Sequence, residues 1–368
     1  MYKAFIITII IIISINLMSC RTPEERRNSA MDPETSQKEL TELSQDSDEY
    51  VRIKVAENQN TPLDVLDKLA EDSSIFVKEA VAGNPNTSCE ILKKLLTWLE
   101  EDEINDDEVE KDIDNIEDID NIEDIDDTDD ENIDEEELKG IGLKIAIAKN
   151  PNASKEILEE LSHEPNEKLI RAVAKHKNTP VDMIKKLALH KDTRVRESVA
   201  ENKKTPAGFV EKLAKDKNEW VRYAAVSNEK ISLDTLMKLA YQDRMASVKR
   251  QCLKKIKELA QNEKTSGDII DRLINEQDVD IRKAVAVHPN ISSYSLTILA
   301  NDSHDRIRES VAKNKKTTSD VLKKLSKDQN AYVRSAVAQN PNTDEETLKK
   351  LSKQGTGRRI GVAKNENA

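Results

Sequence analysis

The sequence predicts an all-α solenoid built from two-helix repeats of about 26 residues. One pattern recurs along the chain, as VRESVAENKKTP from Val195, IRESVAKNKKTT from Ile307 and VRSAVAQNPNTD from Val333. Only 3% of the 368 residues are aromatic and 35% are charged. Such a composition suits thin helical layers better than one large globular core.

Further copies of the pattern extend it over most of the chain. They begin at Val51, Val77, Leu143, Leu169, Val221, Ile281 and Arg358, with a degenerate copy at Val248. A half-copy starting at Asp32 matches the segment that starts at Asn340. We therefore expect repeats over residues 32–99 and 139–368.

The N-terminal segment has the form of an export signal. Lys3 precedes an apolar run of about 14 residues, shorter than the roughly 20 that a helix needs to cross a bilayer core. The run ends in Leu17-Met18-Ser19-Cys20, which resembles the bacterial lipobox. This resemblance implies a signal peptide over residues 1–19 and a lipidated Cys20, followed by a tether over 20–31. An uncleaved anchor or an ordinary signal peptide is the alternative.

Within a copy, the apolar positions have helical spacing and define two short helices. The buried stripe of the first helix is expected at Val195, Ser198, Val199 and Ala200, and that of the second at Val210, Leu213 and Ala214. Asn202 is expected to end the first helix in a left-handed conformation. Thr205 is expected to cap the second helix, with Pro206 at its first position.

The run V-R-x-A-V-A-x-N-P-N-T followed by a Leu-x-x-Leu-Ala stripe resembles the variant leucine-rich repeats, and HEAT-like repeats are the neighbouring family. The resemblance implies a right-handed superhelix and leaves open whether one helix of each copy is α or 3₁₀. A founding member of the family carries a cysteine-ligated iron–sulfur cluster. No such group of cysteines follows Cys20 here, so no cofactor is expected.

An acidic low-complexity segment interrupts the repeats at residues 100–138. From Glu100 to Glu137 it has 24 acidic residues and one lysine, a formal charge of −23, which leaves about +10 for the rest of a chain whose net charge is −13. We expect a disordered loop. Two alternatives remain: weak divalent-cation binding, and a polyanionic mimic that folds back on the solenoid. The candidate cation ligands are Asp112, Asp114, Asp118, Asp120, Asp124 and Asp126.

A basic residue follows the first apolar position of most copies and forms a ladder. Its arginines include Arg196, Arg222, Arg282, Arg308 and Arg334. They could contact a partner, or pair with the aspartates that end the second helices, such as Asp72, Asp216, Asp302 and Asp328.

Two other recurring sets are interpreted as structural. The asparagines from Asn58 to Asn340 are expected to cap helices, and lysine pairs such as Lys323-Lys324 to form a solvated face. Cys89 is expected to start a second helix and Cys252 to lie in a core stripe, too far apart for a disulfide.

These features favour binding over catalysis. The sequence has no Gly-rich phosphate loop, no nucleophile elbow and no metal-ligand spacing among its five histidines. We expect a non-enzymatic, membrane-tethered scaffold that is anchored in the bacterial cell envelope, with the outer membrane or cell surface favoured. Its partner would be a protein or an envelope polymer. The alternative is polyanion or nucleic-acid binding through the basic ladder, although export argues against intracellular nucleic acid.

Overall fold

The computed structural model describes residues 21–102 and 140–353. The chain divides into two compact units, Met1–Phe209 and Val210–Ala368. The predicted signal peptide, the lipidation site Cys20, the six candidate cation ligands from Asp112 to Asp126 and the copy that begins at Arg358 lie outside the described residues.

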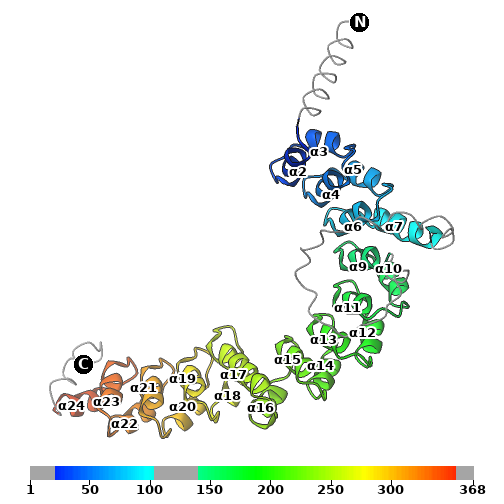
Figure 1. Cartoon of the computed structure of the whole chain (residues 1–368). Helices are drawn as coiled ribbons and strands as arrows, with labels where there is room; N and C mark the ends of the chain where they lie inside the picture. Colours follow the sequence, from blue (N-terminus) through cyan, green and yellow to red (C-terminus); the bar gives the residue numbers. More distant parts are fainter. Residues whose placement is uncertain (1–20, 103–139, 354–368) are drawn as a thin grey trace. The chain divides into compact units, whose positions relative to one another are not determined.

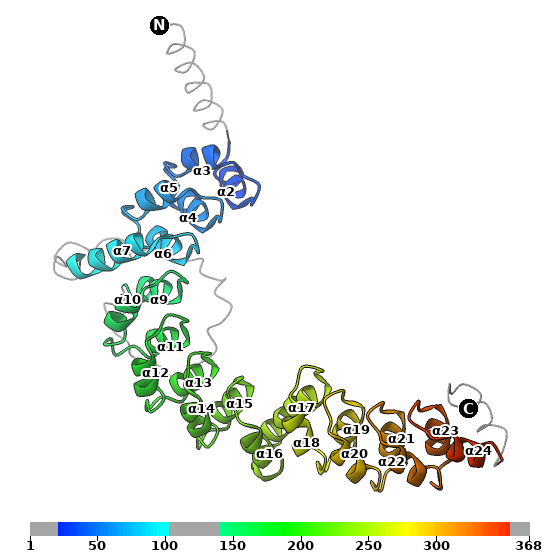
Figure 2. The same ribbon diagram turned by 180° about the vertical axis from the view of Figure 1, so that it is seen from behind.

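Unit 1 is an array of helix pairs (Figures 1 and 2). Its first helices are α2 (Pro23–Met31), α4 (Glu49–Glu57), α6 (Ile75–Gly83), α9 (Ile141–Lys149), α11 (Glu167–Lys175) and α13 (Thr193–Glu201). Its second helices are α3 (Gln37–Leu43), α5 (Leu63–Leu69), α7 (Cys89–Asp102), α10 (Lys155–Leu161) and α12 (Val181–Leu187), and α14 (Ala207–Leu213) spans the boundary between the units.

Unit 2 repeats the same arrangement. Its first helices are α15 (Glu219–Ser227), α17 (Ala246–Gln261), α19 (Val279–Val287), α21 (Asp305–Lys313) and α23 (Ala331–Gln339). Its second helices are α16 (Leu233–Gln242), α18 (Gly267–Arg272), α20 (Ser293–Leu299), α22 (Ser319–Leu325) and α24 (Glu345–Ser352). The predicted all-α solenoid of two-helix repeats is thus confirmed, and every helix within 21–102 and 140–353 is an α-helix, so the 3₁₀ alternative does not apply there.

Two layers make up each unit. Within a unit, the first helices of neighbouring repeats pack directly on one another, and second helices such as α5 and α22 pack on the first helices of their own and the next repeat. Val195, Val199 and Ala200 are buried as predicted, and Ser198 is half-buried. The second-helix stripe at Val210, Leu213 and Ala214 is also buried. Burial of these stripes between layers is what stabilises helices that are too short to be stable alone.

The predicted left-handed conformation of Asn202 is wrong. Asn202 has φ −68° and ψ 122°, which is extended backbone. Its side chain instead reaches the preceding repeat, where Nδ2 donates to the carbonyls of Ala174 at 2.7 Å and His176 at 3.1 Å. Its Oδ1 accepts the N–H of Lys204. The asparagines are therefore structural, but they join repeats rather than supplying a left-handed turn.

The predicted N-cap role of Thr205 is also wrong. Thr205 is fully buried, and its hydroxyl donates back to the carbonyl of Val199 in the first helix. α14 begins at Ala207, so Pro206 precedes the helix rather than occupying its first position. Thr61 and Pro62 repeat this arrangement, with Pro62 as the N-cap of α5. The Thr-Pro pair therefore fixes the connecting loop.

Two predicted boundaries need correction. Residues 23–31 are not a tether, because they form α2, which packs on α4 as the first helix of a repeat. A capping box starts α2: Thr22 Oγ1 accepts the N–H of Glu25, and the Glu25 carboxylate accepts the N–H of Thr22. The repeats also continue beyond residue 99, because α7 ends at Asp102.

The degenerate copy keeps the inter-repeat contacts although its first helix is longer. α17 has 16 residues, against 9 in the other first helices of unit 2. Lys255 takes the place of the ladder asparagine, and its Nζ donates to the carbonyls of Val226 at 2.8 Å and Asn228 at 2.5 Å. Burial lowers the pKa of Lys255. One ammonium group thus replaces the two amide N–H bonds of an asparagine.

Candidate interaction surface

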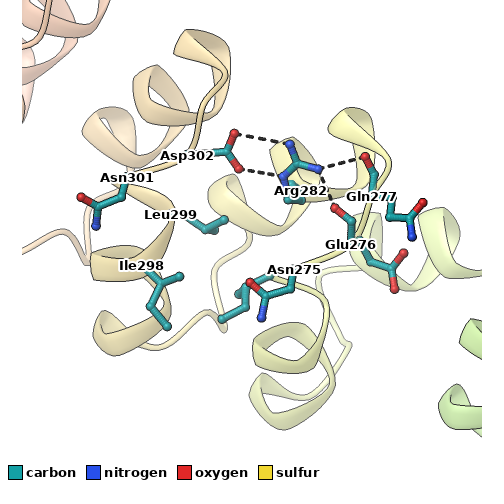
Figure 3. Close-up of a pocket in the computed structure, with 9 residues that line it drawn as sticks. Asn275, Glu276, Gln277, Arg282, Ile298, Leu299, Asn301 and Asp302 are labelled. Atoms are coloured by element: carbon teal, nitrogen blue, oxygen red, sulfur yellow. Dashed lines mark hydrogen bonds and ion pairs between the residues drawn. The ribbon is translucent and has the colours of Figure 1, made fainter.

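The arginine ladder joins consecutive repeats. Arg282 in α19 donates through Nε to Asp302 at 2.7 Å, and through Nη1 to the carbonyls of Glu276 and Gln277 (Figure 3). Asp302 follows α20, the second helix of the same repeat. Glu276 and Gln277 lie before α19, where the preceding repeat ends. Arg52 with Asp72, Arg222 with Asp243 and Arg308 with Asp328 repeat the arrangement.

These contacts occupy the arginines that were candidates for binding a partner. The side chains of Arg222, Arg282 and Arg308 are only 12%, 12% and 18% exposed. Arg196 is buried and donates to the carbonyls of His190 and Lys191. Arg334 donates to the carbonyls of Asp328 and Gln329. The guanidinium groups of Arg222, Arg282 and Arg308 therefore make the aspartate pairing that the sequence left open as the alternative. Those of Arg196 and Arg334 are held by backbone carbonyls.

The pKa values of the ladder carboxyls reflect this pairing. Burial alone would raise the pKa of Asp302, but hydrogen bonds from Arg282 and from the N–H of His304 outweigh it and lower the pKa. Asp328 follows the same pattern with Arg308. Because both carboxyls are ionised when paired, the ladder is a stabilising feature at neutral pH.

A second asparagine ladder was missed in the sequence. Asn86 Nδ2 donates to the carbonyl of Gln59 in the preceding repeat at 2.6 Å, and Asn152 Nδ2 donates to the carbonyls of Pro85 and Thr87. The signal was present as the second asparagine of Asn-Pro-Asn-Thr. A loop that carries both asparagines is therefore held to its neighbour by two side chains.

Histidine replaces the ladder asparagine at two positions. His176 Nε2 lies 2.8 Å from the carbonyl of Asn150, and its Nδ1 accepts the N–H of Asn178. An imidazole that makes both bonds is the neutral tautomer with its proton on Nε2. Burial lowers the pKa of His176, and this outweighs the hydrogen bond to Asn150. His288 is arranged in the same way.

The outward face of the first helices carries most of the exposed aromatic residues. Within 21–102 and 140–353 no aromatic side chain is buried, and six are exposed: Tyr50, Phe76, Trp220, Tyr223, Tyr294 and Tyr332. Four of them, Tyr50, Phe76, Trp220 and Tyr332, stand at the second residue of a first helix. The fifth residue lies one turn on and shares the same face. The side chains at the second and fifth positions belong neither to the core nor to the arginine and asparagine ladders.

The other predicted features lie on separate parts of the fold. The pairs Lys185-Lys186 and Lys323-Lys324 are exposed on second helices, as predicted, whereas Lys94 is half-buried and pairs with Asp67 and Glu71. Cys89 starts α7 and is half-buried, whereas Cys252 is buried in α17, and both thiols are free. Burial raises the pKa of the Cys252 thiol to about 12.

Residues 21–102 and 140–353 offer neither a metal site nor a membrane span. In them, no three His, Cys, Asp or Glu side chains are grouped so as to hold a metal ion. No helix there combines the length and apolar character that crossing a membrane requires.

The fold and this surface define the class of the protein as an α-helical repeat protein of the solenoid type. No family model and no curated protein matches the chain. Among solved structures it is similar to a leucine-rich repeat variant with a novel repetitive structural motif, at 21% identity and a TM-score of 0.38, covering 60% of this chain and 84% of that one.

Larger solved structures are also similar to it, at lower scores. Importin beta matches at 12% identity and a TM-score of 0.28, covering 89% of this chain and 45% of importin beta. A chain of the Pds5–Scc1 complex matches at 14% identity and a TM-score of 0.25, covering 87% of this chain and 48% of that one.

Proposed function

We propose that this protein is a lipid-anchored scaffold of the bacterial cell envelope that binds a protein partner through the outward face of its first helices. The observation that carries the proposal is the placement of the aromatic residues. They are scarce in the sequence, yet Tyr50, Phe76, Trp220 and Tyr332 stand exposed at one repeat position. Exposed aromatic side chains are typical of protein-binding surfaces.

The lipid anchor rests on Leu17-Met18-Ser19-Cys20 at the end of the apolar N-terminal run. Lipidation of Cys20 would attach the chain to a membrane without a spanning helix, because each buried methylene contributes about 0.8 kcal/mol. α2 starts at Pro23, so the first repeat would follow the anchor almost directly.

Fractionation of bacterial cells tests the anchor. Wild-type protein should sediment with membranes, and Cys20→Ala should release it or stop its processing. Protease added to intact cells then reports whether the repeats face outward. A Cys20→Ala protein that remains processed and fully membrane-bound would refute the lipid anchor.

Chemical cross-linking in envelope preparations, followed by purification of the chain, tests the scaffold itself. Wild-type protein should be recovered with a partner in stoichiometric amount, and the quadruple variant of Tyr50, Phe76, Trp220 and Tyr332 to serine should lose it. Recovery of the wild-type chain alone would count against a scaffold. The proposed role is binding, without catalysis.

Polyanion binding is the second candidate function, and it would depend on lysines rather than on the arginine ladder. Lys175, Lys177, Lys203 and Lys204 are exposed at or just after the ends of α11 and α13. Lys177 and Lys204 are close enough to His176 to lower its pKa further. Binding of heparin or single-stranded DNA that disappears in moderate salt and in a four-lysine-to-glutamine variant would favour this role.

A further inference from the structure

Glu79 and Gly142 lie next to each other on two neighbouring repeats. Glu79 is the fifth residue of α6, and Gly142 is the second residue of α9, which packs on α6. A Cβ atom at position 142 would lie 2.2 Å from Glu79 Oε1. The glycine therefore leaves the space that the carboxylate occupies. Arg27 and Tyr50 occupy the same two repeat positions in α2 and α4, where the guanidinium carbon lies 4.6 Å from the ring centroid.

Apolar residues share the outward face with Glu79. The outward face of α4, α6 and α9 carries Tyr50, Ile53, Phe76 and Ile145, which together with Glu79 are called the Glu79 face below. Tyr50 is 55% exposed and Phe76 48%, and the two isoleucines are half-buried. The face therefore combines accessible aromatic rings with one carboxylate.

No hydrogen-bond or ion-pair partner of the Glu79 carboxylate is found among the residues that the structure describes. Burial raises its pKa, with no compensating cation. Glu309 holds the same repeat position in α21 but lies 2.5 Å from the Lys313 ammonium group. A desolvated carboxylate without a partner costs free energy that an incoming cation would recover.

We propose that the Glu79 face binds a protein segment in which one arginine or lysine stands between apolar side chains. The cation would pair with Glu79 and lie beside the Tyr50 and Phe76 rings, and Arg27 already makes such a contact with Tyr50. The chain's own segment from Glu100 to Glu137 does not suit this role, since it has 24 acidic residues and only Lys111 as a cation. The inference rests on the proposed scaffold function and specifies its partner.

Three helical peptides of 15 residues would serve as probes, made of alanine, leucine and glutamine with a central arginine, glutamine or glutamate. Each is titrated by fluorescence anisotropy into the full chain carrying Cys20→Ala. The arginine peptide should bind at least about 10-fold more tightly than the glutamine peptide, as expected for one hydrogen bond to a charged group. Glu79→Gln should remove this preference, and Glu79→Lys should transfer it to the glutamate peptide. Glu309→Gln is the matched control and should leave the preference unchanged.

Gly142→Ala provides a second test that keeps the carboxylate. The added Cβ must displace the Glu79 side chain, which can move because its end is flexible. The arginine preference should fall several-fold while the urea midpoint stays the same or rises, because alanine favours a helix more than glycine does.

Three results would overturn the proposal. The first two are equal binding of the arginine and glutamine peptides, and an arginine preference that survives Glu79→Gln. The third is sedimentation of the chain as a dimer that Phe76→Ser dissociates, because the occupant of the face would then be a second copy of the chain. The scaffold proposal fails separately. If the wild-type chain recovers an envelope protein and Glu79→Gln recovers it equally well, the scaffold stands and the Glu79 face is not its site.

Discussion

Replacing Asn84 by alanine tests whether the asparagine ladder holds the repeats together. Asn84 is 1% exposed. Its Nδ2 donates to the carbonyls of Ala56 at 2.7 Å and Asn58 at 3.0 Å, and its Oδ1 accepts the N–H of Asn86 at 2.9 Å. Alanine would break all three bonds and leave buried polar groups unpaired. At about 1 kcal/mol for each bond, Asn84→Ala should lower the free energy of unfolding by about 3 kcal/mol.

Urea unfolding of the Cys20→Ala chain, followed by circular dichroism, measures this loss. The comparison is valid if the slope of free energy against urea concentration is unchanged. Asn86→Ala is the control: the exposed Asn86 side chain donates one hydrogen bond, to the carbonyl of Gln59, and its loss should cost about 1 kcal/mol. Asn84→His should cost about 1 kcal/mol, like Asn86→Ala, because His176 makes two of the three bonds at this repeat position. A loss for Asn84→Ala no larger than that for Asn86→Ala would refute the ladder's role.

Three other predictions concern buried titratable groups. Asp302→Ala leaves Arg282 without its carboxylate and should cost about 3 kcal/mol at pH 7 in urea unfolding. Because the folded-state pKa of Asp302 is lowered, this loss should shrink as the pH falls through that pKa, and a pH-independent loss would contradict the pairing. His176 also has a lowered pKa, so the stability from its neutral ring is complete above about pH 6.5 and is lost as the pH falls through the folded-state pKa. His176→Asn should therefore flatten the loss of stability on acidification, and an unchanged pH profile would argue against it. In the folded Cys20→Ala chain Cys89 should react with a thiol reagent, whereas Cys252, its pKa raised to about 12 by burial, should react only in denaturant.

The repeat architecture was predictable because the same buried positions recur in many copies. Val195 and Leu213 have counterparts in most repeats, so an error in any one copy matters little. The conformation of Asn202 and the capping role of Thr205 were mispredicted because each residue was considered inside a single helix pair. Their structural roles depend on burial, and for Asn202 on carbonyls of the preceding repeat.

The start of the array was missed for a different reason. α2 lacks the V-R-x-A-V-A pattern, although the run Thr22-Pro23-Glu24-Glu25 has the threonine and glutamate of a capping box, with proline at the first helical position. The signal was therefore local chemistry rather than repetition. Lys255 could not have been recognised in advance, because it replaces an asparagine at a shifted position in a longer helix.

The interaction surface was hidden from a search for recurring residues because it uses positions that differ between copies. The second and fifth residues of a first helix make neither core nor ladder contacts, so each repeat can vary them without disturbing its neighbours. Glu79 and Gly142 depend on one another, yet they lie on opposite sides of the acidic segment in the sequence. Only packing of α9 on α6 brings them together.

The position of the acidic segment adds an electrostatic argument for a cationic partner. The segment joins α7 to α9, and α9 itself carries part of the Glu79 face. Its formal charge of −23 is therefore tethered to the repeats that bear this face, where it attracts cations over about one Debye length, roughly 10 Å at 0.1 M salt. Such a charge raises the association rate of a basic partner, whereas pairing with Glu79 slows its dissociation. Deleting residues 103–137 should accordingly lower the on-rate of the arginine peptide and the salt dependence of that rate, while leaving the off-rate unchanged. Glu79→Gln should raise the off-rate and leave the on-rate unchanged. A deletion that speeds dissociation instead would mean that the segment contacts the bound peptide directly.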